Sequence, residues 1–205
     1  TRVGNFVGNG PFTLKEWQLN KILIVEKNPL YWDADKVQLD QIHFHPIQLA
    51  GTEEKMFRTG KLHVTSTIPA EKISVYLKES PELIRLSPYL GTYFYRLNTT
   101  RPPLDNNKVR MALAMSIDRN LIVEKVTKGG EIPAYTLTPA NTLGYTASEG
   151  VTYDIELAKK LLAEAGYPNG KGFPPLEILY NTLEAHRKIA LAIQQMWKQA
   201  LNIDI

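Results

Sequence analysis

The spacing of the apolar residues changes near residue 50, and this change limits the possible folds more than any other feature of the chain. Before that point, apolar and β-branched residues form three short strand-like runs, at 12–17, 21–26 and 42–45. Turn-forming residues separate these runs, so we expect a small antiparallel sheet. After residue 50, helical spacing alternates with short strand-like runs. This order predicts an α/β fold with mixed sheets and flanking helices.

Residues typical of helix ends indicate where helices begin and end after residue 50. Asn106, Asp118 and Asp154 each precede an amphipathic run, where their side chains can accept a hydrogen bond from the first helical turn. Gly166 follows one run at the position that favours left-handed backbone. We expect helices from residue 52, at 70–77, after each of these three capping residues and at 183–201, strands at 62–65, 83–86, 92–98, 176–180 and from Ile203, and a long loop at 128–152.

Composition and motifs exclude several classes of function. Lys and Arg number 24 against 21 Asp and Glu, a net charge of +3, and the two signs are interspersed. A nucleic-acid-binding protein gathers positive charge on one face, so we expect no nucleic-acid partner. The absence of cysteine excludes disulfides and thiolate metal sites. No apolar run approaches the ~20 residues that cross a bilayer, so we expect no membrane insertion of this segment.

The sequence offers few groups for chemistry. It contains no nucleophile-elbow, zincin, phosphate-loop or dinucleotide-binding motif, so we expect no catalytic residue, metal or cofactor. His43 and His45 share one face of a predicted strand, but no third metal ligand is in view. His63 stands alone. His186 differs, because it lies in the first turns of a helix that follows a strand, where α/β folds place ligands.

An aromatic run lies within the predicted strand 92–98. Alternation places Tyr93 and Tyr95 on one face and Phe94 with Arg96 on the other. A buried phenylalanine beside an arginine is unfavourable. The second face is therefore expected to border something polar.

Several phrases of the sequence, in this order, resemble one family of receptors. They are GNGPFTLKEW at 8–17, EKNPLYW at 26–32, LGTYFYRLNTT at 90–100, PPLD at 102–105, VRMALAMSIDR at 109–119, AKKLLAEAGY at 158–167 and YNT from 180, followed by His186. Together they resemble the peptide-binding receptors of bacterial ABC importers, extracellular solute-binding protein family 5. They are most like the oligopeptide- and murein-peptide-binding branch.

The resemblance implies a type II periplasmic-binding-protein-like fold in which two lobes close over an extended peptide. Such receptors hold the peptide main chain by strand-like hydrogen bonds and deliver it to a membrane permease. It assigns residues 1–88 to part of the first lobe and 89–205 to the first half of the second, peptide-binding lobe, which makes an incomplete two-lobe receptor. It also implies a periplasmic location, or a cell-surface lipoprotein in a Gram-positive organism.

The same resemblance assigns candidate ligand-binding residues. Asn181 and His186 match cleft positions, with the imidazole near the carboxylate at the peptide's C-terminus, which a donor or cationic ring would stabilise. Phe94 and Arg96 match pocket-lining positions, although some members have an acid where Arg96 stands. Thr67 is a further candidate wall residue. The stretch richest in ligand contacts in this family lies beyond residue 205.

Other functions remain open at this point. A receptor of the same fold could bind murein peptides, dipeptides, nickel or haem. From other classes, a small α/β hydrolase and a purely structural interaction module also fit the composition. The chain lacks an initial Met and stops within an apolar alternation at 202–205. We therefore expect it to be a piece of a longer protein, with any signal peptide or lipid anchor upstream.

Overall fold

The structure is a computed structural model that describes residues 3–140, 142–148 and 150–205. The first two residues of the predicted first lobe, and positions 141 and 149 of the predicted loop 128–152, lie outside the described residues. The chain divides into two compact units, Thr1–Glu53 and Glu54–Ile205.

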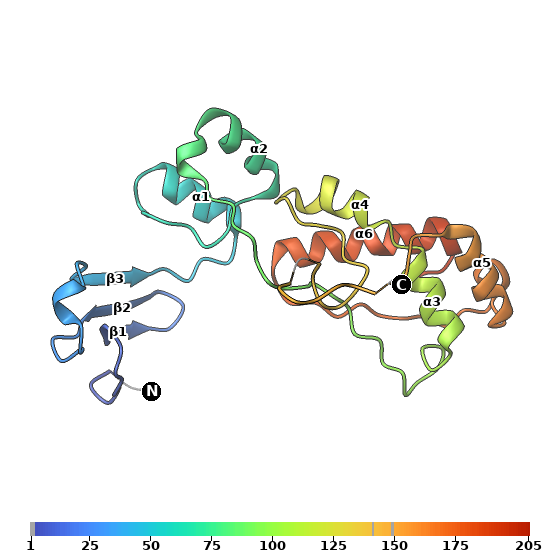
Figure 1. The fold of residues 1–205 in the computed structure, drawn as a ribbon, viewed down its shortest axis with the longest axis horizontal. Helices are drawn as coiled ribbons and strands as arrows, with labels where there is room; N and C mark the ends of the chain where they lie inside the picture. Colours follow the sequence, from blue (N-terminus) through green and yellow to red (C-terminus); the bar gives the residue numbers. More distant parts are fainter. Residues whose placement is uncertain (1–2, 141, 149) are drawn as a thin grey trace. The chain divides into compact units, whose positions relative to one another are not determined.

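The first unit contains the antiparallel sheet that the sequence predicts. Its strands are β1 (Phe12–Gln18), β2 (Ile22–Lys27) and β3 (Gln41–Phe44), with β2 between the other two. Figure 1 shows the three strands side by side near the N-terminal end of the chain. A short 3-10 turn, η1 (Ala34–Lys36), lies between β2 and β3. All three predicted strands are therefore confirmed.

Asn28, directly after β2, links the two ends of the β1–β2 hairpin by hydrogen bonds. It is 6% exposed. Its side-chain amide donates to the Gly10 carbonyl at 2.9 Å, and its Oδ1 accepts from the Leu30 N–H at 3.0 Å. Its own N–H donates to the Pro11 carbonyl. One buried polar side chain thus satisfies a backbone carbonyl before β1 and a backbone N–H after β2.

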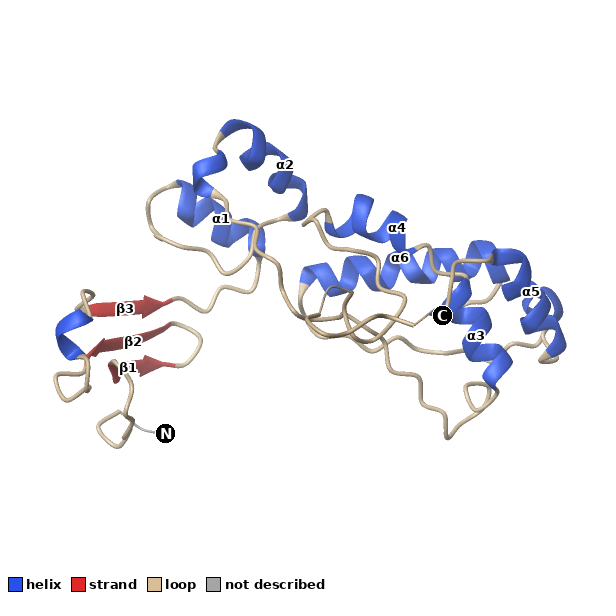
Figure 2. Cartoon of the chain, viewed as in Figure 1, coloured by secondary structure: helices blue, strands red, loops and turns tan. Residues whose placement is uncertain are grey.

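The second unit is helical in the part that the structure describes (Figure 2). The division between the units falls within the first helix, α1. The helices are α1 (Ala50–Arg58), α2 (Ala70–Glu79), α3 (Asn107–Met115), α4 (Arg119–Leu121), α5 (Ile155–Glu164) and α6 (Glu184–Leu201), with 3-10 turns η2 (Pro81–Leu83) and η4 (Pro168–Gly170) and a π-helical turn, η3 (Ile122–Thr127).

The predicted helix ends are confirmed by their geometry. Asn106 accepts a hydrogen bond from the Lys108 N–H, Asp118 from that of Leu121, and Asp154 from that of Leu157, each near 3 Å. Gly166, directly after the C-cap residue Ala165 of α5, has φ +98. These features depend on a few neighbouring residues, which is why the sequence predicted them correctly.

The core of the second unit forms where α3, α5 and α6 meet. Side chains at most 2% exposed come from all three helices and from the residues after α6: Val109, Leu113, Leu162, Leu201 and Ile203. The indole N–H of Trp197 donates to the Leu113 carbonyl at 2.9 Å. This bond satisfies the polar atom of a ring that is 6% exposed and joins α6 to α3.

The strands expected after residue 50 are wrong in this structure. Segments 62–65, 84–86, 92–98, 176–180 and 203–205 are neither helix nor strand, and Leu83 belongs to the turn η2. A strand needs a hydrogen-bonded neighbour, and within the described ranges no strand follows β3. Several apolar side chains in these segments are open to solvent, with Leu179 94% and Val64 80% exposed, whereas Ile203 packs in the core.

The total solvent-accessible surface is also larger than expected for a protein with its apolar segments packed. It amounts to 14990 Å². Two separately folded units of these sizes would expose about 11,000 Å² together. The excess exposed surface includes the segments in which paired strands were predicted.

We expect Leu162→Ala to lower the free energy of unfolding of the intact protein by about 2–5 kcal/mol, because Leu162 is 1% exposed at the α3–α5 contact. Leu157→Ala, in the same helix at 39% exposure, is the matched control and should cost less than about 1 kcal/mol. Urea denaturation followed by tryptophan fluorescence measures both. Equal losses would contradict the assignment of the core.

Candidate functional site

Helix α6 carries the first candidate residue. Its apolar stripe, Ile189, Ile193 and Trp197, is buried, so the helix is held firmly against the core. His186 lies in the first turn and is half-buried. The position predicted for His186, near the N-terminus of a helix, is confirmed. The segment before it, however, is not a strand.

The start of α6 is favourable for an anion. Asn181 accepts a hydrogen bond from the Leu183 N–H through Oδ1 at 3.1 Å, which shapes the turn into the helix. Leu183, at the N-cap position, supplies no side-chain acceptor to the first turn. The positive end of the helix dipole and the imidazole of His186 therefore lie together. This arrangement can bind a carboxylate.

An aromatic cluster supports His186. The imidazole lies 4.8 Å from the Tyr93 ring, centroid to centroid, with an interplanar angle of 43°. Tyr93 meets Tyr95 edge-to-face, at 5.7 Å and 82°. Tyr95 packs against the core of the second unit. Tyr93 and Tyr95 thus share a face, as alternation predicted, although their segment has no neighbouring strand.

The hydroxyl of Tyr95 is buried, and among the described residues no partner meets hydrogen-bond geometry, although the Tyr93 phenol is close enough to raise the pKa of Tyr95. Burial raises the pKa of Tyr95 well above its usual range, and the nearby phenols of Tyr93 and Tyr180 act in the same direction. The ring is therefore neutral at physiological pH. It serves as a packed support, not as a charged group.

The other face of this segment presents Phe94 and Arg96. The guanidinium carbon of Arg96 lies 5.9 Å from the centroid of the Phe94 ring, within the range of a cation–π contact. Phe94 is 52% exposed, and Arg96 is exposed as well. The predicted pairing of these side chains on one face is confirmed. Their role as pocket-lining residues stays a prediction.

An ion-pair network joins the start of α2 to the start of α6. Lys188 Nζ lies 2.9 Å from Glu184 and 3.6 Å from Glu71. The hydrogen bond with Glu184 raises the pKa of Lys188. The pKa of Glu71 is lowered, first by a hydrogen bond from its backbone and then by Lys188.

Thr67, the remaining predicted site residue, is exposed and lies in the segment directly before α2.

Four of the five predicted residues therefore fall into two groups that are in contact, and Thr67 stands apart from them in the sequence, before α2. Asn181 and His186 share the start of α6, and the segment of Phe94 and Arg96 contacts His186 through Tyr93. Tyr93 was not among the predicted binding residues, although its aromatic run was expected either to line a pocket or to fill a core. Its position on the same face as Tyr95 was visible in the alternation, but its contact with His186 depends on packing between distant segments.

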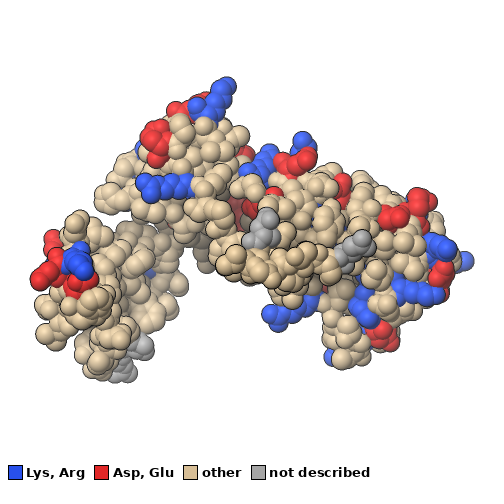
Figure 3. Space-filling model, in the orientation of Figure 1, with Lys and Arg blue, Asp and Glu red and all other residues tan. Residues whose placement is uncertain are grey.

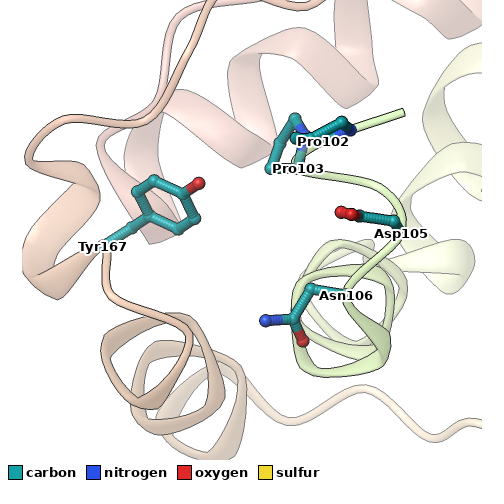
Figure 4. Close-up of a pocket in the computed structure, with 5 residues that line it drawn as sticks. All are labelled: Pro102, Pro103, Asp105, Asn106 and Tyr167. Atoms are coloured by element: carbon teal, nitrogen blue, oxygen red, sulfur yellow. The ribbon is translucent and has the colours of Figure 1, made fainter.

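A separate hollow of about 260 Å³ lies away from these residues, lined by Pro102, Pro103, Asp105, Asn106 and Tyr167. In Figure 4 the ring of Tyr167 faces the other four residues across the opening. The Asn106 side chain is already committed to capping α3. None of the predicted site residues lines this hollow, and we assign it no function.

In the part of the chain that the structure describes, charged and metal-binding groups form no second site. On the face drawn in Figure 3, positive and negative side chains are interspersed, without a large area of one sign. The described residues contain no group of three His, Cys, Asp or Glu that could hold a metal ion. Within the same residues, no helix is long and apolar enough to cross a membrane.

Comparison with known proteins decides the family. The model of the bacterial extracellular solute-binding proteins, family 5 Middle, matches residues 1–205. The chain belongs to this family. It is 36% identical over 212 residues to the periplasmic oligopeptide-binding protein OppA of Escherichia coli, covering 100% of this chain and 39% of OppA. It thus spans about two fifths of that relative's length.

Solved structures confirm the periplasmic-binding-protein-like fold that the resemblance implied. The murein tripeptide-binding protein MppA of Escherichia coli superposes with a TM-score of 0.93 at 39% identity, over 100% of this chain and 41% of MppA. OppA of Haemophilus influenzae, in complex with the peptide RPPGFSPFR, gives 0.82 at 35% identity, over 98% and 41%.

We expect Tyr95→Phe to be neutral, or to stabilise the intact protein by up to about 1 kcal/mol at pH 8, because it removes a buried hydroxyl without a partner. The folded state holds this proton where an unfolded tyrosine, with a pKa of about 10, has lost it. Stability is therefore full below about pH 10 and falls as the pH rises above it.

Urea denaturation at pH 8 and at about pH 11 should show a smaller decline for Tyr95→Phe than for the wild type. A substantial loss of stability at pH 8 would mean that the hydroxyl has a partner. The same decline in both proteins would mean that its titration is not linked to folding.

Proposed function

We propose that this chain is part of the substrate-binding component of an ABC importer. The protein captures oligopeptides in a cleft between two lobes and delivers them to a membrane permease. The observation that carries this proposal is the group around the half-buried His186, which combines an aromatic-supported imidazole with the N-terminus of α6. Membership of the solute-binding family and the peptide seen in the Haemophilus influenzae relative support it.

In this proposal His186 and the first turn of α6 receive the carboxylate at the C-terminus of the peptide, and Asn181 lies beside them. Phe94 and Arg96 line a side-chain pocket, and Thr67 contributes to a wall. Nothing is catalysed, and no cofactor or metal takes part. His186 and the backbone N–H groups of the first turn can donate hydrogen bonds to an anion, and the negative charge of Glu184 in the same turn is paired with Lys188.

We further propose that residues 1–88 and 89–205 belong to different lobes. The support is the run from Arg85 to Leu90, in which every residue is exposed. The boundary between the two compact units falls earlier, at Glu53 and Glu54. We propose a periplasmic location, because OppA of Escherichia coli is periplasmic, or a cell-surface lipoprotein in a Gram-positive organism.

A receptor for murein peptides is the second candidate. The superposition with MppA, at a TM-score of 0.93, favours it. Mass spectrometry of ligands that copurify with the intact protein separates the two. Short peptides of mixed sequence support the oligopeptide receptor, whereas peptides containing diaminopimelate support the murein-peptide receptor.

We expect His186→Ala to weaken binding of a peptide with a free C-terminus about tenfold or more, because a hydrogen bond to a charged group is lost. Isothermal calorimetry of the intact protein at neutral pH measures this. His43→Ala is the matched control: His43 is an exposed histidine of β3, in the first unit, and its replacement should leave the affinity unchanged.

The same peptide with a C-terminal amide identifies the group that His186 binds. Amidation should weaken binding to the wild type but cost little more in His186→Ala, since the partner is already gone. Equal affinity of His186→Ala and the wild type would remove His186 from the site. Turnover of a peptide or ester substrate that His186→Ala abolishes would refute a transport receptor in favour of a hydrolase.

A further inference from the structure

The orientation of the His186 ring has an unusual basis. A binding histidine is ordinarily oriented by a hydrogen bond on its second nitrogen. Among the described residues the His186 imidazole makes no hydrogen bond or ion pair, and its ring contact is with Tyr93, at 4.8 Å and 43°. This separation is within the 4.5–7 Å of attractive aromatic pairs. This tilted ring–ring contact therefore takes the place of the usual hydrogen bond.

Tyr93 is itself held in place by Tyr95. Its ring meets Tyr95 edge-to-face at 5.7 Å, and Tyr95 packs against the core that α3, α5 and α6 share. The Tyr95 hydroxyl is buried, Tyr93 is 48% exposed, and His186 is half-buried. A rigid support thus extends from the core to the imidazole.

We propose that Tyr93 is a positioning residue for His186, an inference that rests on the proposed role of His186 in holding the ligand's carboxylate. The Tyr93 ring fixes the imidazole in one orientation before the ligand arrives. A ring that is already ordered loses less side-chain freedom on binding, which is worth roughly threefold to tenfold in affinity. The effect comes from the aromatic ring, and the proposal does not need the Tyr93 hydroxyl.

This distinction supplies the test. Tyr93→Phe keeps the ring and should bind as the wild type does, within about twofold. Tyr93→Leu keeps an apolar side chain without the ring and should bind trialanine roughly threefold to tenfold more weakly. Tyr153→Leu is the matched control, because Tyr153 is 43% exposed and lies outside the proposed site. It should leave the affinity unchanged.

Two further measurements separate positioning from a general loss of structure. In a His186→Ala background, Tyr93→Leu should cause no further loss, and trialanine amide should be nearly insensitive to it. In NMR spectra of the ligand-free intact protein, the ring protons of His186 should lose their ring-current shift in Tyr93→Leu and keep it in Tyr93→Phe.

The positioning role is overturned if Tyr93→Leu binds trialanine as the wild type does, or if its effect persists in the His186→Ala background. Unmoved His186 ring protons in Tyr93→Leu would overturn it as well. If the wild type binds neither trialanine nor copurified peptides, the proposed function fails instead. The NMR comparison then still decides whether Tyr93 holds the imidazole.

Discussion

The packing of α6 against α3 and α5 is the constraint on which the rest of the second unit depends. The Trp197 indole fills the helix interface and donates its N–H to the Leu113 carbonyl, so α6 can neither slide nor rotate without leaving a buried donor unpaired. The buried stripe of α6 begins at Ile189, about one turn after His186. The same packing that stabilises the unit therefore fixes where the candidate ligand-binding ring lies.

The sequence predicted the features that depend on neighbouring residues. The caps Asn106 and Asp154 and the long helix α6 follow from local hydrogen bonds and apolar spacing. The strand expected at 92–98 did not form, because a ladder needs a partner segment, and spacing alone cannot supply one. Its side-chain alternation survived nevertheless, since Tyr93 and Tyr95 still share a face.

In the candidate site, too, local features could be predicted from the sequence and contacts between distant segments could not. The position of His186 at a helix start could be read from the order of the elements. Its contact with Tyr93 could not, because packing between segments far apart in the sequence has no local signature. Family resemblance supplied Phe94 and Arg96 as neighbours of the ligand, whereas the structure showed that their segment contacts His186 through its opposite face.

The unpaired segment at 176–180 has a practical consequence. Leu179, 94% exposed, lies where neither helix nor strand satisfies the main-chain N–H and C=O groups. Such a stretch is a template for pairing with a second copy of itself. If these 205 residues were produced alone, the chains would tend to join into aggregates along it. Production within the intact protein is thus the safer route to material for crystallisation.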